Sequence, residues 1–425
     1  MKPNRLMGIS SLLILAGFYV WSLCRVQGDV QRTYEEEIRR TPPYNQKELP
    51  SPNPGGTSRQ EFLLALKRYG ELHNDMLDGK RPGKYLTFCN APSGWSDRVR
   101  GFISVATVAF MTDRAFLFKE MPDINMTAVY AQDNIRWFAE PDVPVVHSFE
   151  VGYMRLEEEL LREDTIERMR EQLGNIQLTM SDWAWEDIAR HPLLATDRAR
   201  LRLDDVPEWA SLLFDFIFPP SPIVKDALRD YVDLVPSPRM AIHIRTGAAE
   251  GSNQFFSGSL ETYVEREINC FKSVVKSEGF TKVTVFLATD IQPAFDIAKA
   301  LIEAMQGENL SVRVMDGSAM GSVGHLFLEQ HHTLSTQLRA NTEWEILRRS
   351  EWVFPSRSGF SLLPFGLRHS PSTRAFTTNL NPAGACEEIQ PLGLGWFFVM
   401  DNHDDSRKTS LILPASPPSD IHWFL

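Results

Sequence analysis

The chain has 425 residues, of which 43% are hydrophobic and 23% are charged, a balance typical of a folded protein and not of a disordered one. The formal net charge of −11 argues against a nucleic-acid-binding protein, which needs a basic face to neutralise phosphates. One or two local arginines are still enough to hold a diphosphate. The length accommodates a short anchor and two packed α/β domains.

The first feature along the chain is a nearly uncharged run from Leu6 to Leu23. A run of about 18 apolar residues is just long enough to cross a hydrocarbon core of roughly 30 Å as a helix. Lys2 and Arg5 precede it and place the N-terminus in the cytosol. The alternative is a cleaved signal peptide, which usually has a shorter apolar core and a small-residue cleavage site. Either interpretation puts the rest of the chain in the secretory pathway.

Residues 25–59 change character, because a charged stretch is followed by prolines and a glycine pair. With few apolar side chains to bury, this segment is predicted to be an extended stem. A cytosolic tail (1–5), an anchor (6–24), a stem and a large luminal part form the layout of a single-pass type II membrane protein. In the lumen, the sequons that begin at Asn125 and Asn309 would be available for glycosylation.

The four cysteines are Cys24, Cys89, Cys270 and Cys386. None forms a C-x-x-C pair, which argues against a zinc site or thioredoxin-like chemistry. Cys24 lies at the edge of the apolar run and leaves three cysteines in the body of the protein. In an oxidising lumen we expect one disulfide and one free thiol. The sequence leaves open which two cysteines pair.

The first α/β unit is predicted from apolar periodicity. Tyr85–Phe88 is a candidate strand that ends at Cys89, and a helix follows from about Asp97 to Thr112. Ala115–Phe118 is the next strand. A strand, a glycine-containing loop, a helix and a second strand predict the start of an open α/β sheet.

The second half of the chain repeats this pattern. Strands are predicted at 240–245, 283–288 and 352–354, and helices at 260–277 and from about Phe360. Polar residues follow each strand, and in open α/β sheets ligands bind beyond the carboxyl ends of the strands. We therefore predict two Rossmann-like α/β domains that face a cleft. The first, acceptor-side domain spans residues 60–236, the second, donor-binding domain spans 237–380, and a C-terminal extension covers 381–425.

Arg245, at the end of the third predicted strand, is the strongest single candidate for chemistry. A guanidinium there can bind a diphosphate through two parallel hydrogen bonds and neutralise charge on the departing nucleotide. The structural alternative is an arginine paired with a nearby acid. His243 lies two residues earlier and points the same way. It could contact the base or phosphate, or be a satisfied core histidine.

Two more loops carry candidate binding residues. The loop Ser356-Arg357-Ser358-Gly359 precedes a helix, so its backbone N–H groups and hydroxyls form an anion nest. Asp290 could bind a ribose or guanine edge, or cap the next helix.

The sequence also bears on metal chemistry. It contains no Asp-x-Asp motif, which favours a site where arginine and helix N-termini hold the diphosphate in place of a metal ion. His325, His331 and His332 lack the spacing of a metal site, and we interpret them as loop residues.

Taken together, these segments resemble the fucosyltransferase superfamily, most closely the plant xyloglucan fucosyltransferase family, from about Tyr69 to Leu367. The strand Ile242–Arg245 matches an I-x-I-R or H-x-R strand whose arginine contacts the GDP β-phosphate across the superfamily. The other matching segments are Tyr69-Gly70-Glu71-Leu72-His73 (Y-x-x-L-H), Ser93-Gly94-Trp95-Ser96-Asp97-Arg98 (S-G-L-G-N-R), Ala109-Phe110-Met111-Thr112-Asp113-Arg114 (like A-L-L-T-N-R), Phe218-Pro219-Pro220-Ser221 (similar to F-H-P-T) and Thr342 to Phe360 (the third, nucleotide-binding motif).

The resemblance implies a GT-B fold, GDP-fucose as the donor, inversion at the anomeric carbon, and no metal or other cofactor. It also implies a Golgi enzyme of cell-wall or glycan biosynthesis that adds fucose in α1,2 linkage to galactose of a glycan acceptor. Arg98 is carried over as a contact to GDP-fucose. The departures are Trp95-Ser96 in place of Leu-Gly, Asp97 in place of Asn, and His243 where the plant enzymes usually have Gln.

Inversion needs a group that accepts the proton of the acceptor hydroxyl. Glu250 lies where α1,6-fucosyltransferases place a candidate glutamate, and Asp97 is the alternative. Glu250 could equally be a solvated loop carboxylate. Two other functions stay open: a non-catalytic GDP-sugar or glycan-binding relative, and a transferase of the same fold with another donor or a protein acceptor. The choice between a monomer and a homodimer also stays open.

Overall fold

The computed structural model describes residues 57–89, 94–119, 124–138, 143–151, 160–180, 185–232, 235, 237–247, 258–307, 309–317, 333–356, 358–368, 370, 372–378 and 385–389. The predicted cytosolic tail, the anchor and nearly all of the stem lie outside these residues, as does most of the C-terminal extension. Among the described residues, no helix combines the length and the apolar character that a membrane crossing requires.

The first lobe is built on a parallel four-stranded sheet in the order β2-β1-β4-β3. Buried residues run through β1, β2 and β4, which is typical of parallel strands covered on both faces. The predicted strands β1 and β2 are confirmed, whereas β3 and β4 were missed. The strands are β1 (Lys84–Cys89), β2 (Ala115–Phe118), β3 (Val145–Val151) and β4 (Gly174–Met180).

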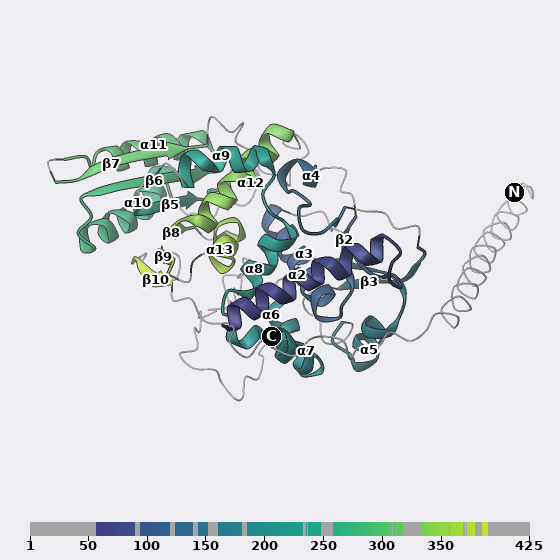
Figure 1. The fold of residues 1–425 in the computed structure, drawn as a ribbon. Coiled ribbons are helices and arrows are strands. Elements are labelled where there is room, and N and C mark those ends of the chain that lie inside the picture. The colour runs from purple at the N-terminus through teal and green to yellow at the C-terminus, as the bar shows by residue number, and fades with distance from the viewer. Residues whose placement is uncertain are drawn as a thin grey trace, which may run out of the picture.

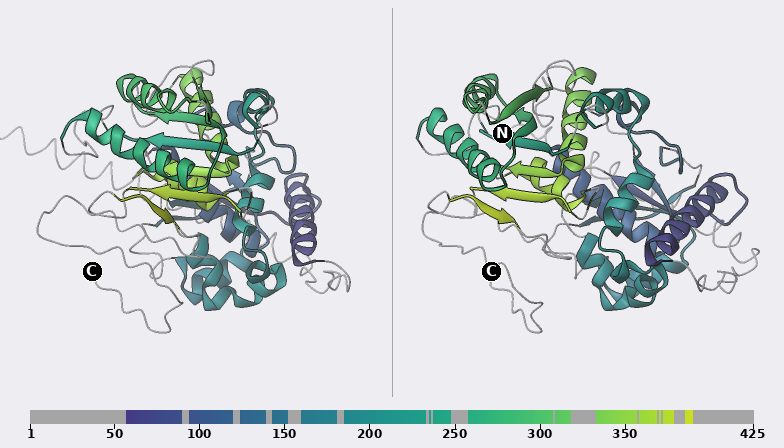
Figure 2. Two further views of the ribbon diagram at one scale, coloured as in Figure 1. Left: turned by 90° about the vertical axis from the view of Figure 1, so that its left-hand side faces the viewer. Right: turned by 60° about the vertical axis from the view of Figure 1, so that its left-hand side comes forward.

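The second lobe carries a six-stranded sheet in the order β10-β9-β8-β5-β6-β7, parallel except for the pairing of β9 with β10. Helices cover both faces (Figures 1 and 2). Met240, Ile242 and Ile244 pack with α10 (Leu260–Ser277) and α11 (Gln292–Glu303). Ala241 packs with α12 (Leu334–Arg349) and α13 (Gly359–Gly366). The strands are β5 (Arg239–Ile244), β6 (Lys282–Thr289), β7 (Ser311–Asp316), β8 (Trp352–Pro355), β9 (Arg374–Thr377) and β10 (Glu387–Ile389).

The helices connect these strands in the alternating order of an α/β fold. The predicted helix at 260–277 is confirmed with the same bounds, and the one predicted from about Asp97 begins two residues earlier. The helices are α2 (Ser58–Leu77), α3 (Trp95–Met111), α4 (Met126–Val129), α5 (Glu163–Glu171), α6 (Trp185–Arg190), α7 (Ala195–Leu201), α8 (Trp209–Ile217), α9 (Pro222–Val232), α10 (Leu260–Ser277), α11 (Gln292–Glu303), α12 (Leu334–Arg349) and α13 (Gly359–Gly366).

The two lobes share one continuous apolar core. Trp344 of α12 packs against Phe214 of α8, with ring centroids 5.2 Å apart. In Figure 1, α8, α12 and α13 lie between the two sheets. Helix α9 precedes the predicted domain boundary at 236, yet it packs on α12. The Tyr231 hydroxyl of α9 also donates to the Met240 carbonyl of β5, at 2.7 Å. This helix therefore belongs with the second sheet.

A buried arginine holds the amino ends of the first sheet. Arg114 is fully buried, and its guanidinium donates to the carbonyls of Tyr85, Met169, Gln172 and Gly174 at 2.8–3.1 Å. These carbonyls come from β1, the start of β4 and the end of α5. The segment around Arg114, one of those that carried the family resemblance, therefore has a structural role.

Tyr69 and His73 of another such segment support the same region from α2. The Tyr69 hydroxyl donates to the Arg114 carbonyl at 2.9 Å and accepts the Phe116 N–H at 3.2 Å. The ring nitrogen Nε2 of His73 lies 2.8 Å from the Phe116 carbonyl oxygen. Burial lowers the pKa of His73 to about 4, so the ring is neutral and Nε2 donates.

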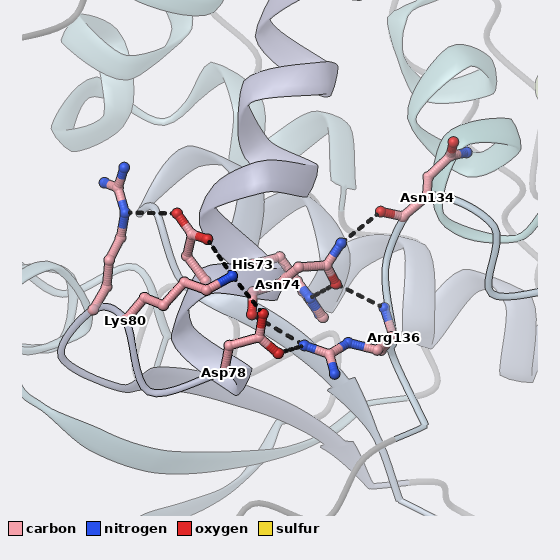
Figure 3. A network of polar contacts seen from close by, with 8 residues as sticks. His73, Asn74, Asp78, Lys80, Asn134 and Arg136 are labelled. Carbon is pink, nitrogen blue, oxygen red and sulfur yellow. Dashed lines mark hydrogen bonds and ion pairs between the residues drawn. The ribbon is translucent and has the colours of Figure 1, made fainter.

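The last turn of α2 is joined to the segment after α4 by a surface network (Figure 3). The Asn74 side chain donates to the Asn134 carbonyl at 3.1 Å and accepts the Arg136 N–H at 3.3 Å. Asp78 pairs with both Lys80 and Arg136, and its hydrogen bonds to them lower its pKa. Because these charges are solvated, the network orients the chain more than it stabilises it.

The second lobe is closed at its β10 edge by a disulfide and a stacked arginine. Cys270 of α10 is bonded to Cys386, next to β10. Arg374 pairs with Glu388 through two hydrogen bonds and stacks on Trp352, 4.5 Å from the ring centroid. Cys89 is a free thiol. The expected combination of one disulfide and one free thiol is thus present among the described cysteines.

Candidate functional site

The carboxyl ends of β5, β6 and β8 meet at one edge of the second sheet. The parallel register places Ile244 opposite Thr289 and His243 opposite Pro355. The residues that come next in each strand's loop therefore lie side by side. They are Arg245, Asp290 and Ser356, three of the residues predicted from the sequence.

Arg245 is buried, with 8% of its side chain exposed. Its Nη1 lies 3.3 Å from Oδ2 of Asp290, so the side chain is ion-paired, as in the structural alternative left open by the sequence. Its backbone N–H donates to the Ser356 hydroxyl at 3.1 Å, and its carbonyl accepts from the Tyr263 hydroxyl at 2.9 Å. Arg245 nevertheless lies at the sheet edge that the binding interpretation requires.

Asp290 fixes the start of the loop after β5. Its Oδ1 accepts from both the N–H and the hydroxyl of Thr246 at 2.9 Å, and its Oδ2 accepts the Gly247 N–H at 2.8 Å. Gly247 has φ of 72°, a left-handed conformation that favours glycine. The N-cap of α11 is Ile291 and makes no side-chain cap. Asp290 therefore does not cap α11, and the proposed contact to ribose or guanine stays a prediction.

His243 and Ser356 form a buried pair on neighbouring strands. The Ser356 hydroxyl oxygen lies 3.0 Å from His243 Nδ1, and burial lowers the pKa of His243 to about 3. The ring is therefore neutral. The Ser356 hydroxyl also accepts the Arg245 N–H, and because a hydroxyl has two acceptor lone pairs, the tautomer of the neutral ring decides whether Nδ1 accepts from Ser356 or donates to it. The core-histidine alternative thus holds for Nδ1, which has a buried partner.

The loop after β8 begins α13 against the first lobe. The Ser358 hydroxyl accepts the Phe360 N–H at 3.2 Å as the N-cap. A Cβ on Gly359 would lie 2.3 Å from Nη2 of Arg100 and 3.2 Å from the hydroxyl of Ser96. A side chain at this position would require the Arg100 guanidinium to move. The N-termini of α13 and α3, one from each lobe, therefore abut at this point.

The remaining predicted site residues are divided between this junction and undescribed parts of the chain. Asp97 lies in the first turn of α3, with 43% of its side chain exposed, and pairs with Arg100 at 3.2 Å. Arg98 is buried in the same turn. Arg357 and Glu250 lie outside the described residues, as do His325, His331 and His332. In the part of the chain that is described, no group of three or more His, Cys, Asp or Glu is placed to hold a metal ion.

Sequence reasoning did not single out two residues of this site. Arg100 contacts the α13 N-terminus from the first lobe, and its signal was its spacing three residues after Asp97 on a predicted helix. Tyr263, on α10, holds the Arg245 carbonyl. Nothing in the local sequence pointed to Tyr263, because its contact depends on how α10 packs on the sheet.

Solved structures with this two-lobe arrangement exist. A variant of FUT1 from Arabidopsis thaliana, in complex with GDP, superposes with a TM-score of 0.57 at 11% identity, over 82% of this chain and 88% of that one. The chain has a fucosyltransferase fold. The α/β, GT-B-like architecture predicted from the sequence is therefore confirmed, and it is built on two largely parallel sheets.

More distant likenesses extend to two other fucosyltransferases. NodZ from Bradyrhizobium matches with a TM-score of 0.41 at 14% identity, over 73% of this chain and all of that one. POFUT1 in complex with GDP matches with a TM-score of 0.39 at 11% identity, over 70% of this chain and 99% of that one. No protein-family model matches the sequence. No curated protein matches it significantly.

Proposed function

We propose that this protein is an inverting, metal-independent glycosyltransferase that moves fucose from GDP-fucose to a glycan acceptor. One observation carries the proposal. Arg245, Asp290 and Ser356 meet at the carboxyl edge of a parallel sheet, beside a helix N-terminus and opposite the other lobe. Helix N-termini and guanidinium groups are the parts of a protein best suited to bind a diphosphate. The fold shared with a FUT1 structure that contains GDP supports this choice of nucleotide.

In this proposal the second lobe holds the donor. The Arg245 guanidinium binds the diphosphate and stabilises the charge that develops on GDP as it leaves. A guanidinium carries five N–H donors in a fork, so pairing with Asp290 and binding a phosphate are compatible roles for one side chain. The ion pair orients the fork in advance. The N-terminus of α13 supplies further donors at the same edge.

The acceptor is proposed to bind on the side of the first lobe. Asp97 is in the first turn of α3, on the helix that meets α13, and it remains a candidate base together with Glu250. Trp95, one of the departures from the plant family, is buried and stacks on Tyr130, with centroids 6.2 Å apart. This substitution therefore fills the core. It does not block the interlobe face, which favours an enzyme over a non-catalytic relative. The α1,2 linkage to galactose rests on the family resemblance alone.

We propose a Golgi, type II location with the two lobes in the lumen. The Cys270–Cys386 disulfide supports an oxidising compartment. Asn125 and Asn309 are both exposed, as glycosylation requires. The Asn125 side-chain oxygen also caps α4 by accepting the Ala128 N–H. The side-chain nitrogen, to which an N-linked glycan attaches, is not used by this cap.

The test is release of GDP by the secreted luminal part, from Arg25 onward, so that the capping box of Thr57 with Gln60 stays intact. GDP-fucose is supplied with galactose-terminated glycans in the presence of EDTA, and GDP-mannose and UDP-galactose serve as donor controls. We expect acceptor-dependent release from GDP-fucose that survives EDTA. Loss of release with EDTA would contradict the metal-free mechanism, and release from another donor alone would contradict the assignment of fucose.

A further inference from the structure

A second buried arginine, Arg348, lies where the two lobes join, away from the donor residues. It is in the last turn of α12, just before β8, and its side chain is fully buried. The guanidinium lies over the rings of both Phe214, 4.5 Å from its centroid, and Trp344, 5.1 Å from its centroid. Nothing in the donor site requires a charge at this point. Its contacts therefore need an explanation of their own.

The partners of Arg348 come from three different elements. Within α12, its Nη1 contacts both carboxylate oxygens of Glu345, at 3.0 and 3.1 Å. From α8 of the first lobe, Asp215 and Ser211 accept from its Nη2 at 2.9 and 3.2 Å. Its Nε donates to the carbonyl of Leu367, the residue that ends α13, at 2.8 Å. One planar group thus ties both helices that flank β8 to the first lobe.

The link from α8 to α13 is made twice. The Ser211 hydroxyl donates to the same Leu367 carbonyl at 2.8 Å. We call Arg348 and its partners Glu345, Asp215, Ser211 and Leu367 the clamp. Helix α13 runs from Gly359, at the interlobe junction, to Gly366, next to the clamp. An eight-residue helix is a rigid rod about 12 Å long. Fixing the Leu367 end therefore fixes where the Gly359 end meets α3.

The energetics favour a geometric role over a purely stabilising one. A buried ion pair often contributes no more stability than apolar residues of the same volume, because desolvating the charges is costly. Burial raises the pKa of Asp215, although the neighbouring Arg348 opposes that rise. Apolar packing alone does not specify direction, whereas the guanidinium fork accepts only one orientation of its partners.

We propose that Arg348 is a positioning residue that sets the orientation of the two lobes, so that the N-terminus of α13 and the first turn of α3 form one preassembled site. This inference rests on the proposed function for its catalytic consequence. All the described donor residues, Arg245, Asp290 and Ser356 among them, belong to the second lobe. Loss of the clamp therefore impairs acceptor use and turnover while leaving GDP binding nearly intact.

The variants are chosen so that unfolding does not hide the answer. Arg348→Met alone leaves Glu345 and Asp215 as uncompensated buried acids and can unfold the protein. The triple variant Arg348→Met, Glu345→Gln, Asp215→Asn removes all three charges and is expected to fold. The matched control is Arg349→Met. Arg349 is next in sequence and bonds to Glu345 of its own helix, without a hydrogen bond to α8 or α13.

The experiment measures GDP affinity by calorimetry, kcat and acceptor KM, and hydrogen exchange of α3 and α13. For the triple variant we expect GDP affinity within about twofold of wild type, because one intact lobe holds GDP, but kcat at least tenfold lower, acceptor KM raised and faster exchange at both helix N-termini. The control behaves as wild type. Unchanged exchange and kcat in the triple variant would overturn the proposal, as would an equal loss in the control.

The exchange measurement separates this inference from the proposed function. If the wild-type protein transfers no sugar, the function fails, yet faster exchange in the triple variant alone still supports the clamp. If transfer is normal in wild type and in the triple variant, the function stands and the clamp fails.

Discussion

Two buried arginines, Arg114 and Arg245, lie at opposite ends of parallel strands. Arg114 lies at the amino ends of the first sheet and donates to four backbone carbonyls. Arg245 lies at the carboxyl edge of the second sheet and pairs with a carboxylate that also holds the neighbouring loop. Both occur in segments that resemble the same family. Position relative to the strand ends thus separates a structural arginine from a candidate binding one.

The largest expected effect is at Arg245. Arg245→Lys keeps the charge but loses the fork, and we expect GDP release to fall on the order of a hundredfold or more, as for loss of a transition-state donor. Asp290 keeps its bonds to Thr246 and Gly247, so the fold persists by circular dichroism. Near-wild-type release from Arg245→Lys or Arg245→Ala would show that Arg245 is a second structural arginine.

Arg114→Met should lower stability and leave activity unchanged. Each of the four lost hydrogen bonds contributes about 1 kcal/mol, so we expect the free energy of unfolding to fall by about 4 kcal/mol in denaturant titrations. Activity per folded molecule should not change, because Arg114 is at the end of the sheet away from the site. If kcat of Arg114→Met fell as much as kcat of the Arg245 variants, Arg114 would not be a purely structural arginine.

The smallest expected effects are on the pH dependence of stability, through the buried histidines His73 and His243. Burial depresses the pKa of His73 to about 4 and that of His243 to about 3, below their ordinary 6.5. The unfolded chain therefore binds more protons in this range, so stability present above pH 6.5 is lost as the pH falls toward 4. Unfolding curves should show this slope, reduced in His73→Gln. A slope unchanged in that variant would contradict a buried neutral His73.

Glu186 should act in the opposite direction at higher pH. Burial raises its pKa to about 7, so stability present below pH 4.5 is lost as the pH rises through 7. Unfolding curves of Glu186→Gln should therefore lack the part of the stability loss that occurs as the pH rises from 4.5 to 7, and a curve unchanged over this range would contradict a raised pKa of Glu186.

Local sequence was sufficient for most elements of the site but not for its contacts. Alternating apolar residues placed the strands that contain Ile242 and Val285, and polar residues after those strands indicated the proposed binding edge. The roles of Asp290 and Ser356 were not predicted, because each depends on partners at least 43 residues away in the chain. Sequence pattern could not show that Arg245 and Asp290 are paired, since it does not give the order of strands in a sheet.

By itself, then, the sequence determined the α/β alternation, the strand that leads into Arg245 and the end of the sheet where polar loops gather, because these follow from short-range periodicity and from the two-sided burial of parallel strands. Only the tertiary structure decided the order of the strands, the partner of Cys270, the side on which α9 packs and the clamp around Arg348. Those features depend on contacts between residues far apart in the chain. Several strand orders, disulfide partners or helix positions are compatible with the same local sequence pattern, and long-range packing selects one of them.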